Sequence, residues 1–154
     1  MYAFMKLRTL MLMLVLLVVT IPASATERPF ALKGAGVATL IVDEAGHLIG
    51  ATPTGSGTAT HLGQWTVSGN VKYTLTDGVL KSSGDATLVA ADGDKLYIQI
   101  DGILDPVAAI DQGIFHFVGG TGRFANATGD ANFVVSINPV TGGFDLTVVG
   151  KIDY

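Results

Sequence analysis

The sequence predicts an all-β domain that closes into an antiparallel barrel and is preceded by a signal peptide. Val, Ile and Thr are abundant and alternate with polar residues in period two, which indicates strands. No stretch sustains apolar residues at helical spacing for several turns. Short turn sequences rich in Asp, Asn and Gly separate the alternating segments, so that neighbouring segments can pair as antiparallel hairpins.

Residues 1–25 have the pattern of a secretory signal. Lys6 and Arg8 precede an apolar run that begins at Leu10, and Pro22 and a small-x-small end at Ala25 follow the run. The run is short for a bilayer span, and polar residues follow it at once, which disfavours the alternative of a retained membrane anchor. We therefore expect cleavage after Ala25 and a single barrel domain over residues 26–154.

The composition limits the partners and the compartment. Of the 9 basic and 13 acidic residues, removal of the signal peptide takes away Lys6 and Arg8 and no acid, so the mature domain is acidic. An acidic domain without a basic stripe disfavours nucleic acid and anionic lipid as partners. The absence of cysteine excludes disulfides, thiolate metal sites and a lipoprotein anchor. The sequence therefore predicts a secreted or periplasmic protein with no stable membrane anchor after cleavage.

Five strands are expected before residue 92. They are Phe30–Val42, His47–Pro53, Gly57–Gly63, Gln64–Thr76 and Gly84–Ala91. The turn signal Asp43-Glu-Ala-Gly46 ends the first of them, and Asp77-Gly78 ends the fourth. Asp92-Gly93-Asp94 follows the fifth. These two Asp residues resemble the start of a calcium loop, but the later ligands are missing, which favours a simple turn.

Four strands are expected in the remainder of the chain. They are Lys95–Asp101, Gly113–Gly119, Ala131–Asn138 and Gly143–Asp153. Alternation is clearest here, and three sets of apolar residues each share one face of a strand: Leu96, Ile98 and Ile100; Phe133, Val135 and Ile137; and Phe144, Leu146, Val148 and Ile152. One face of each strand is therefore expected to be buried and the other to be wetter.

Closure follows from the number of strands. Eight or nine short antiparallel strands leave exposed edges unless the sheet closes, and an up-and-down barrel or a sandwich removes this problem. Sequential hairpins without long crossovers favour the barrel. The stretch from Asp101 to Asp111 is expected to be a longer connection that folds over one mouth of the barrel.

One loop carries a family resemblance. The segment Gly119-Gly-Thr-Gly-Arg-Phe-Ala-Asn-Ala-Thr-Gly129 resembles the GGTG-R/K-F-x-x-A-x-G loop of the allene oxide cyclase and dirigent superfamily. The residues that carry it are Gly119, Gly120, Gly122, Arg123, Phe124 and Gly129. A structural role alone accounts for them and is the favoured explanation, because the glycines permit unusual backbone angles and Phe124 can enter the core. A phosphate cradle is rejected because no Lys-Ser/Thr pair follows.

The resemblance implies a closed, calycin-like barrel of eight strands, assembled as a homo-oligomer, with an interior that holds a small hydrophobic molecule. In that superfamily, allene oxide cyclases rearrange an unstable epoxide and dirigent proteins steer the coupling of phenoxy radicals. With the signal peptide, the resemblance indicates an exported bacterial member. Outside the loop, no catalytic position of the plant members aligns with this sequence.

Few residues suggest chemistry. His61, Tyr97 and His116 are candidate ligand-facing residues, although an isolated strand histidine bonded to a neighbour is the simpler interpretation. Asp101, Asp105 and Asp111 could divide acid and base roles, but they are expected to solvate a loop. No spacing indicates a metal site, a cofactor or a serine nucleophile, so no catalytic residue is assigned.

Three functions remain, in this order. The first is a non-catalytic exported barrel that binds a small apolar or aromatic molecule. The second is a structural or interaction module of the cell envelope. The third is an isomerase or cyclase similar to allene oxide cyclase, in which shape and a few polar groups guide an already reactive substrate.

Overall fold

The computed structural model describes residues 26–154. The predicted signal peptide, residues 1–25, lies outside the described residues. Among the residues that are described, no helix is long and apolar enough to cross a bilayer.

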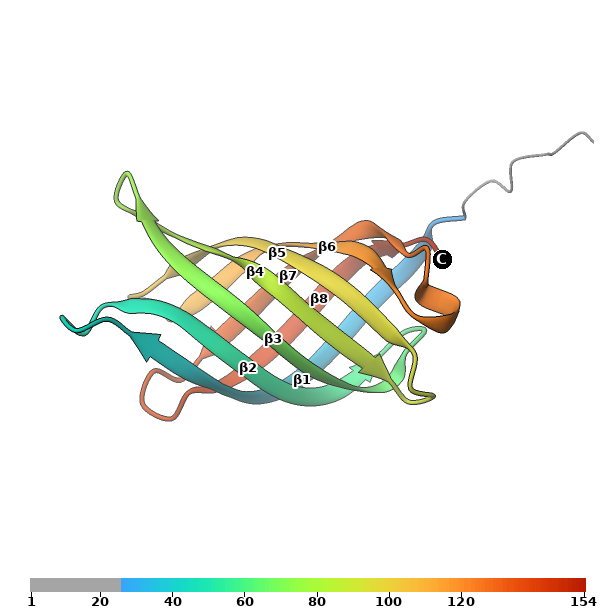
Figure 1. The fold of residues 1–154 in the computed structure, drawn as a ribbon, viewed down its shortest axis with the longest axis horizontal. Coiled ribbons are helices and arrows are strands. Elements are labelled where there is room, and N and C mark those ends of the chain that lie inside the picture. Colours follow the sequence, from blue (N-terminus) through green and yellow to red (C-terminus); the bar gives the residue numbers. More distant parts are fainter. Residues whose placement is uncertain (1–25) are drawn as a thin grey trace, which may run out of the picture.

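Eight antiparallel strands form one closed barrel (Figure 1), as the family resemblance implies, whereas the alternation pattern alone predicted nine strands. The strands are β1 (Arg28–Val42), β2 (Leu48–Ala59), β3 (Gly63–Thr76), β4 (Val79–Ala90), β5 (Lys95–Asp105), β6 (Ile110–Gly120), β7 (Thr128–Ile137) and β8 (Gly143–Ile152). Each strand pairs with the next along the chain, and β8 pairs with β1 from Arg28↔Ile152 to Val37↔Gly143. Closure leaves no free sheet edge, which removes a site of unwanted strand pairing.

The expected strands 47–53 and 57–63 are in fact one strand, β2. Pro53 caused the error, because proline lacks the N–H that a ladder requires and often ends a strand. Here Pro53 still pairs with Ala38 of β1, and only the ladder with β3 is interrupted, between Ala51↔Val71 and Thr54↔Ser68. The strand therefore continues to Ala59.

The expected long connection from residue 101 to 111 is also wrong. β5 runs on to Asp105 and β6 begins at Ile110, so the connecting turn is short. Asp105 stabilises this turn by accepting hydrogen bonds from the backbone N–H groups of Val107 (2.9 Å) and Ala108 (3.0 Å).

The two ends of the barrel differ. We call the end that carries the turns at 43–47, 77–78, 106–109 and 138–142 the mouth. The opposite end, which we call the closed end, carries the turns at 60–62, 91–94 and 121–127 and both ends of the described chain (Figure 1). The 121–127 turn contains the short 3₁₀ helix η1 (Gly122–Phe124).

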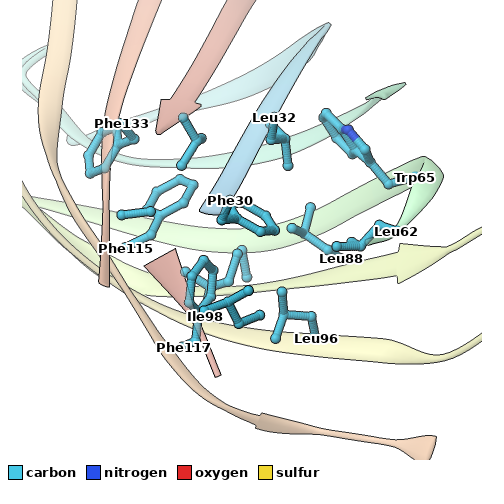
Figure 2. Packing of buried hydrophobic residues seen from close by; sticks show 14 of the residues in the cluster. Phe30, Leu32, Leu62, Trp65, Leu88, Leu96, Ile98, Phe115, Phe117 and Phe133 are labelled. Carbon is cyan, nitrogen blue, oxygen red and sulfur yellow. The ribbon is translucent and has the colours of Figure 1, made fainter. Parts of the chain in front are cut away.

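The inward faces of the strands form the core, and it is densest towards the closed end. The alternation predicted for β5, β7 and β8 is confirmed, since Leu96, Phe133 and Val148 are all buried. Aromatic rings meet inside the barrel: Phe30 and Phe117 have ring centroids 4.9 Å apart, and Phe115 and Phe133, on neighbouring strands, stack at 4.5 Å (Figure 2). Each such side chain contributes about 1.5–3 kcal/mol by burial, which makes this cluster the main source of stability.

The loop that carries the family resemblance plugs the closed end. Phe124 is fully buried, and its ring centroid lies 4.9 Å from that of Tyr154. Arg123 stays outside and joins three turns: it forms an ion pair with Asp92 (3.0 Å), and it donates a hydrogen bond to the carbonyl oxygen of His61 (2.7 Å). The loop is therefore a structural closure of the barrel.

Candidate ligand-binding site

An apolar cavity of about 70 Å³ lies inside the barrel. Its walls come from all eight strands, and the residues that line it are Ala38, Ala51, Pro53, Val67, Val71, Tyr73, Ala86, Leu88, Ile98, Ile100, Asp111, Phe115, Phe133, Val135, Ile137, Phe144 and Leu146. A small cluster of Ala51, Tyr73 and Leu104 packs near the mouth. The cavity is the feature that most resembles a ligand site, because such sites are concave, mainly apolar and supplied with few polar groups.

Asp111 is the only charged residue among the described residues that line the cavity. It is the second residue of β6, and its side chain is directed inward with only 5% of the residue exposed. Its Oδ1 accepts a hydrogen bond of 2.7 Å from the hydroxyl of Ser82, which is itself fully buried on β4. Its Oδ2 lies 3.5 Å from the Tyr73 hydroxyl on β3, a distance at the limit for a hydrogen bond.

The strand register explains how these three side chains meet. Tyr73 and Ser82 are directly paired between β3 and β4, and Ser82 is paired with Gly102 of β5. Because Gly102 has no side chain, Ser82 and Asp111 can approach each other across β5. A Cβ built on Gly102 would lie 2.6 Å from Ser82 Oγ and 2.8 Å from Phe133 Cζ, so the space above this glycine is already filled.

Burial controls the protonation of this group. Removal from water raises the pKa of Asp111, and the hydrogen bonds from Ser82 and Tyr73 oppose that rise only in part. Burial also raises the pKa of Tyr73, and the neighbouring Asp111 charge adds to the effect, so Tyr73 stays neutral at physiological pH. A perturbed carboxyl in a cavity is a common mark of a functional site.

Four aromatic side chains line the same cavity: Tyr73, Phe115, Phe133 and Phe144. Phe115 and Phe133 stack with an interplanar angle of 25°, and Figure 2 shows the two rings side by side. The ring of Phe144 lies over two glycines of β1 and β2, since a Cβ on Gly36 or Gly55 would lie within about 3 Å of its Cζ. The cavity therefore presents aromatic surface and one carboxyl group.

A groove at the mouth adjoins the cavity. Its lining includes Asp43, His47, Leu48, Leu80 and Asp105, and Tyr73 lines both the groove and the cavity. Tyr73 thus stands between the interior and the solvent-facing groove.

None of the three candidate ligand-facing residues lines the cavity, so the expectation that they face the interior does not hold. Tyr97 lies on the outer face of β5 and is 38% exposed. His116 is on the outer face of β6, where Nδ1 lies 2.6 Å from Asp130 Oδ1. His61 lies in the turn at 60–62, and its Nε2 donates to the carbonyl oxygen of Pro29 at 2.9 Å. Strand alternation explains the outward placement, because the neighbours of Tyr97 and His116 are the inward residues.

Asp111 was assigned to a solvated loop by the sequence analysis, and this assignment is wrong. A signal was present, since Asp111 has the same parity as Phe115 and Phe117 and therefore shares their face of β6. Asp101 and Asp105 are exposed, as a solvating role requires. Among the described residues, no group of three or more His, Cys, Asp or Glu residues could hold a metal ion.

Comparison with known proteins supports the fold. No family model and no curated protein matches the sequence. Among solved structures, the chain is similar to the pterocarpan synthase dirigent protein PsPTS1, with a TM-score of 0.54 and 14% identity, over 84% of this chain and 96% of that one. The pterocarpan synthase dirigent protein GePTS1 gives a TM-score of 0.49 and 16% identity, over 84% and 91%. The first likeness shows that the fold is a dirigent-like barrel, as the loop at Gly119 predicts.

Proposed function

We propose, from this dirigent-like barrel, that the protein binds a small apolar or aromatic molecule in the interior cavity. The observation that carries the proposal is an apolar, aromatic-lined cavity with a single buried carboxyl, Asp111, at its mouth side. Asp111 and the Tyr73 hydroxyl supply the polar contacts that orient the molecule. The likeness to a pterocarpan synthase dirigent protein supports the fold on which this proposal rests.

The cavity has to widen on binding. An engineered cavity that binds benzene has a volume of about 150 Å³, whereas this cavity measures about 70 Å³. We expect Tyr73 to be the side chain that moves, because it lines both the cavity and the groove. Each CH₂ group that a ligand buries contributes about 0.8 kcal/mol, which offsets the cost of such a movement.

A catalytic role in the same cavity is the second candidate, and one observation favours it. The raised pKa of Asp111 in an apolar site is a property of carboxyl groups that donate or accept protons in reactions. An isomerase or cyclase would use Asp111 for proton transfer and the cavity walls for shape. Substitution by Asn would then abolish conversion of a substrate and leave its binding in place.

Ligand titration tests binding directly. The titration adds 4-phenyl-1-butanol and monitors binding through the amide chemical shifts of the protein. We expect the amide shifts of Tyr73, Asp111 and Phe133 to change together. Ala86→Leu fills the cavity and should weaken binding at least tenfold, whereas Ala35→Leu on the exposed face of β1 should leave it unchanged. Absence of binding, or equal binding to both variants, would contradict the proposal.

Together with ligand binding, we propose that the protein is exported after cleavage of its signal peptide and that it assembles as a homo-oligomer. These proposals can be tested by native mass spectrometry of the full chain produced in an exporting host. One spectrum gives the cleavage site, the oligomeric state and the mass of any retained molecule. We expect a chain that begins at Thr26, a homo-oligomer as the family resemblance implies, and a mass increment from a retained apolar molecule. An empty monomer would favour the alternative of a structural module.

A further inference from the structure

We infer that the barrel selects organic cations: the bound molecule carries a protonated amine that lies against Asp111, while its apolar part lies among the aromatic side chains. This inference rests on the proposed function, since it names the chemical class that the same cavity takes. Three features of the described residues carry it: a buried carboxyl without a cationic partner, aromatic walls, and an acidic approach from the mouth.

The first feature is the absence of a counter-charge at Asp111. The polar groups that face it are the hydroxyls of Tyr73 and Ser82, while Leu104 and Val135, its partners on β5 and β7, are apolar. No Lys, Arg or His is among the described residues that line the cavity. An ionised carboxyl in such a place is costly unless it is paired. An ammonium group would supply the missing charge, whereas a neutral hydroxyl would not.

Geometry leaves one oxygen of Asp111 for a ligand. Oδ1 is occupied by Ser82 at 2.7 Å, but Oδ2 has only the 3.5 Å contact with Tyr73. Tyr73 also lines the groove. A molecule that enters from the groove and displaces the Tyr73 hydroxyl would therefore meet Oδ2 directly.

The aromatic walls are the second feature. Cations are attracted to the faces of aromatic rings, and the attraction grows when water is removed. Phe133 lies next to the Ser82–Asp111 pair, because both Phe133 Cζ and Ser82 Oγ lie within 3 Å of a Cβ position on Gly102. Phe115 stacks on Phe133 from the neighbouring strand. A carboxyl beside aromatic faces suits an organic ammonium better than an anion or a neutral polar group.

The third feature is the charge at the mouth. Its turns contain Asp43, Glu44 and Asp77, Asp105 ends β5 beside them, and none of these turns contains Lys or Arg. Hydrogen bonds from His47 lower the pKa of Asp43, so this carboxyl stays ionised at neutral pH. Asp43 and Asp105 line the groove that leads to Tyr73. Negative charge around an opening raises the local concentration of cations and disfavours anions.

The test uses a matched pair of molecules, 4-phenylbutylamine and 4-phenyl-1-butanol, at pH 7.5. Both carry the same ring and chain, and only the amine is charged. We expect the amine to bind at least tenfold more tightly to the mature protein. Asp111→Asn should remove most of this difference, and Asp101→Asn, an exposed carboxyl on the outer face of β5, should retain it.

A second measurement on the unmodified protein keeps the test valid if Asp111→Asn does not fold. The carboxyl ¹³C resonance of Asp111 reports its pKa, which the amine should lower and the alcohol should not. Equal affinity for amine and alcohol would overturn the inference and leave the proposed function intact. Tighter amine binding that leaves the Asp111 resonance unchanged would assign the cation to the surface and also overturn it. Binding of neither molecule would contradict both the inference and the proposed function.

Discussion

At the scale of single residues, Asp111 combines two opposed influences. Desolvation acts against its charge, and the Ser82 hydroxyl at 2.7 Å acts in favour of it. The net result is a carboxyl that is kept in the interior at a cost to stability. Such a residue is retained more readily for a function than for packing, since an apolar side chain of similar size would be cheaper to bury.

This cost predicts a pH dependence of stability. An unfolded Asp titrates near 3.9, and the pKa of folded Asp111 lies above that value. Between the two values the folded chain binds more protons than the unfolded chain, so the contribution of Asp111 to the free energy of unfolding falls as pH rises, and it levels off above the folded pKa. In Asp111→Asn this decrease in the free energy of unfolding should be absent. We therefore expect the variant to become more stable relative to the parent as pH rises.

Denaturant titrations of parent and variant between pH 3 and pH 8 measure the difference. Asp101→Asn is the matched control, because that carboxyl is exposed and its substitution should give a nearly constant offset. A difference between parent and Asp111→Asn that stays flat with pH would show that burial does not govern this carboxyl.

The candidate site could be predicted only in part. Inward and outward faces follow from local alternation, so the burial of Phe115 and Phe117 was predictable and the inward direction of Asp111 should have been. The contact of Asp111 with Ser82 depends on the register across β5 and on the missing side chain of Gly102, which no local pattern contains. The size of the cavity depends on how the side chains of eight strands fill the interior together, and sequence patterns along single strands do not predict it.

At the scale of elements, the ends of a strand could be predicted where turn residues flank it. The prediction failed where a proline lies inside the strand. Asp77 and Gly78 both have positive φ (52° and 79°), as the turn between β3 and β4 requires. Pro53 gave a false strand end because its effect is confined to one of two ladders. A proline can therefore interrupt pairing without ending a strand of a barrel.

The closing loop allows a prediction about what holds an element in place. Phe124 is fully buried, and Phe124→Ala should cost about 3–5 kcal/mol. The side chain of Arg123 is 40% exposed, and exposed ion pairs contribute about 0.2–1 kcal/mol, so Arg123→Ala should cost under about 1 kcal/mol. Chemical denaturation measures both. Equal costs would show that the loop is held by charge as much as by packing.

Gly122 tests the backbone of the same loop. Its φ of +56° is uncommon for residues with a side chain, and a Cβ at this position would collide with the carboxylate of Asp94. Replacement by Ala should therefore destabilise the protein by more than about 1 kcal/mol, whereas an unstrained Gly→Ala exchange stabilises a protein by about 0.4–1 kcal/mol. Gly46, which has φ +85° but open space around it, is the control that isolates the collision. Similar costs at both positions would assign the effect to φ alone.

At the scale of the whole molecule, the two ends of the barrel have different roles: one is packed closed, and the other carries the groove. The closed end holds the dense core, the buried Phe124 and both ends of the described chain, whereas the mouth holds the groove and several acidic residues, and the cavity lies between the two ends. If the cavity widens on binding, we expect the change to occur at Tyr73 near the mouth, because the densely packed residues lie at the other end. This division is a property of closure, since every strand spans both ends (Figure 1).

Closure also predicts that the position of the chain ends is arbitrary. Lys151 and Glu27 form an ion pair of 3.0 Å across a sequence separation of 124, and β1 pairs with β8 as any two neighbours do. Joining Tyr154 to Thr26 by a short Gly/Ser linker and opening the chain between the exposed Glu44 and Ala45 only exchanges one short connection for another. Loop-closure entropy then changes by under about 1 kcal/mol, so we expect cooperative unfolding at a similar denaturant midpoint.

The folding rate should change little as well, because every such permutant has one pair of strands that must meet over the full chain length. The matched control opens the joined chain between Ile98 and Gln99, inside β5, where it breaks a ladder on both sides, and this variant should not unfold cooperatively. If the chain opened at Glu44 also fails to fold, the turn between β1 and β2 is a required nucleus. The eight strand pairings would then not be equivalent, and the barrel would assemble from that turn onward.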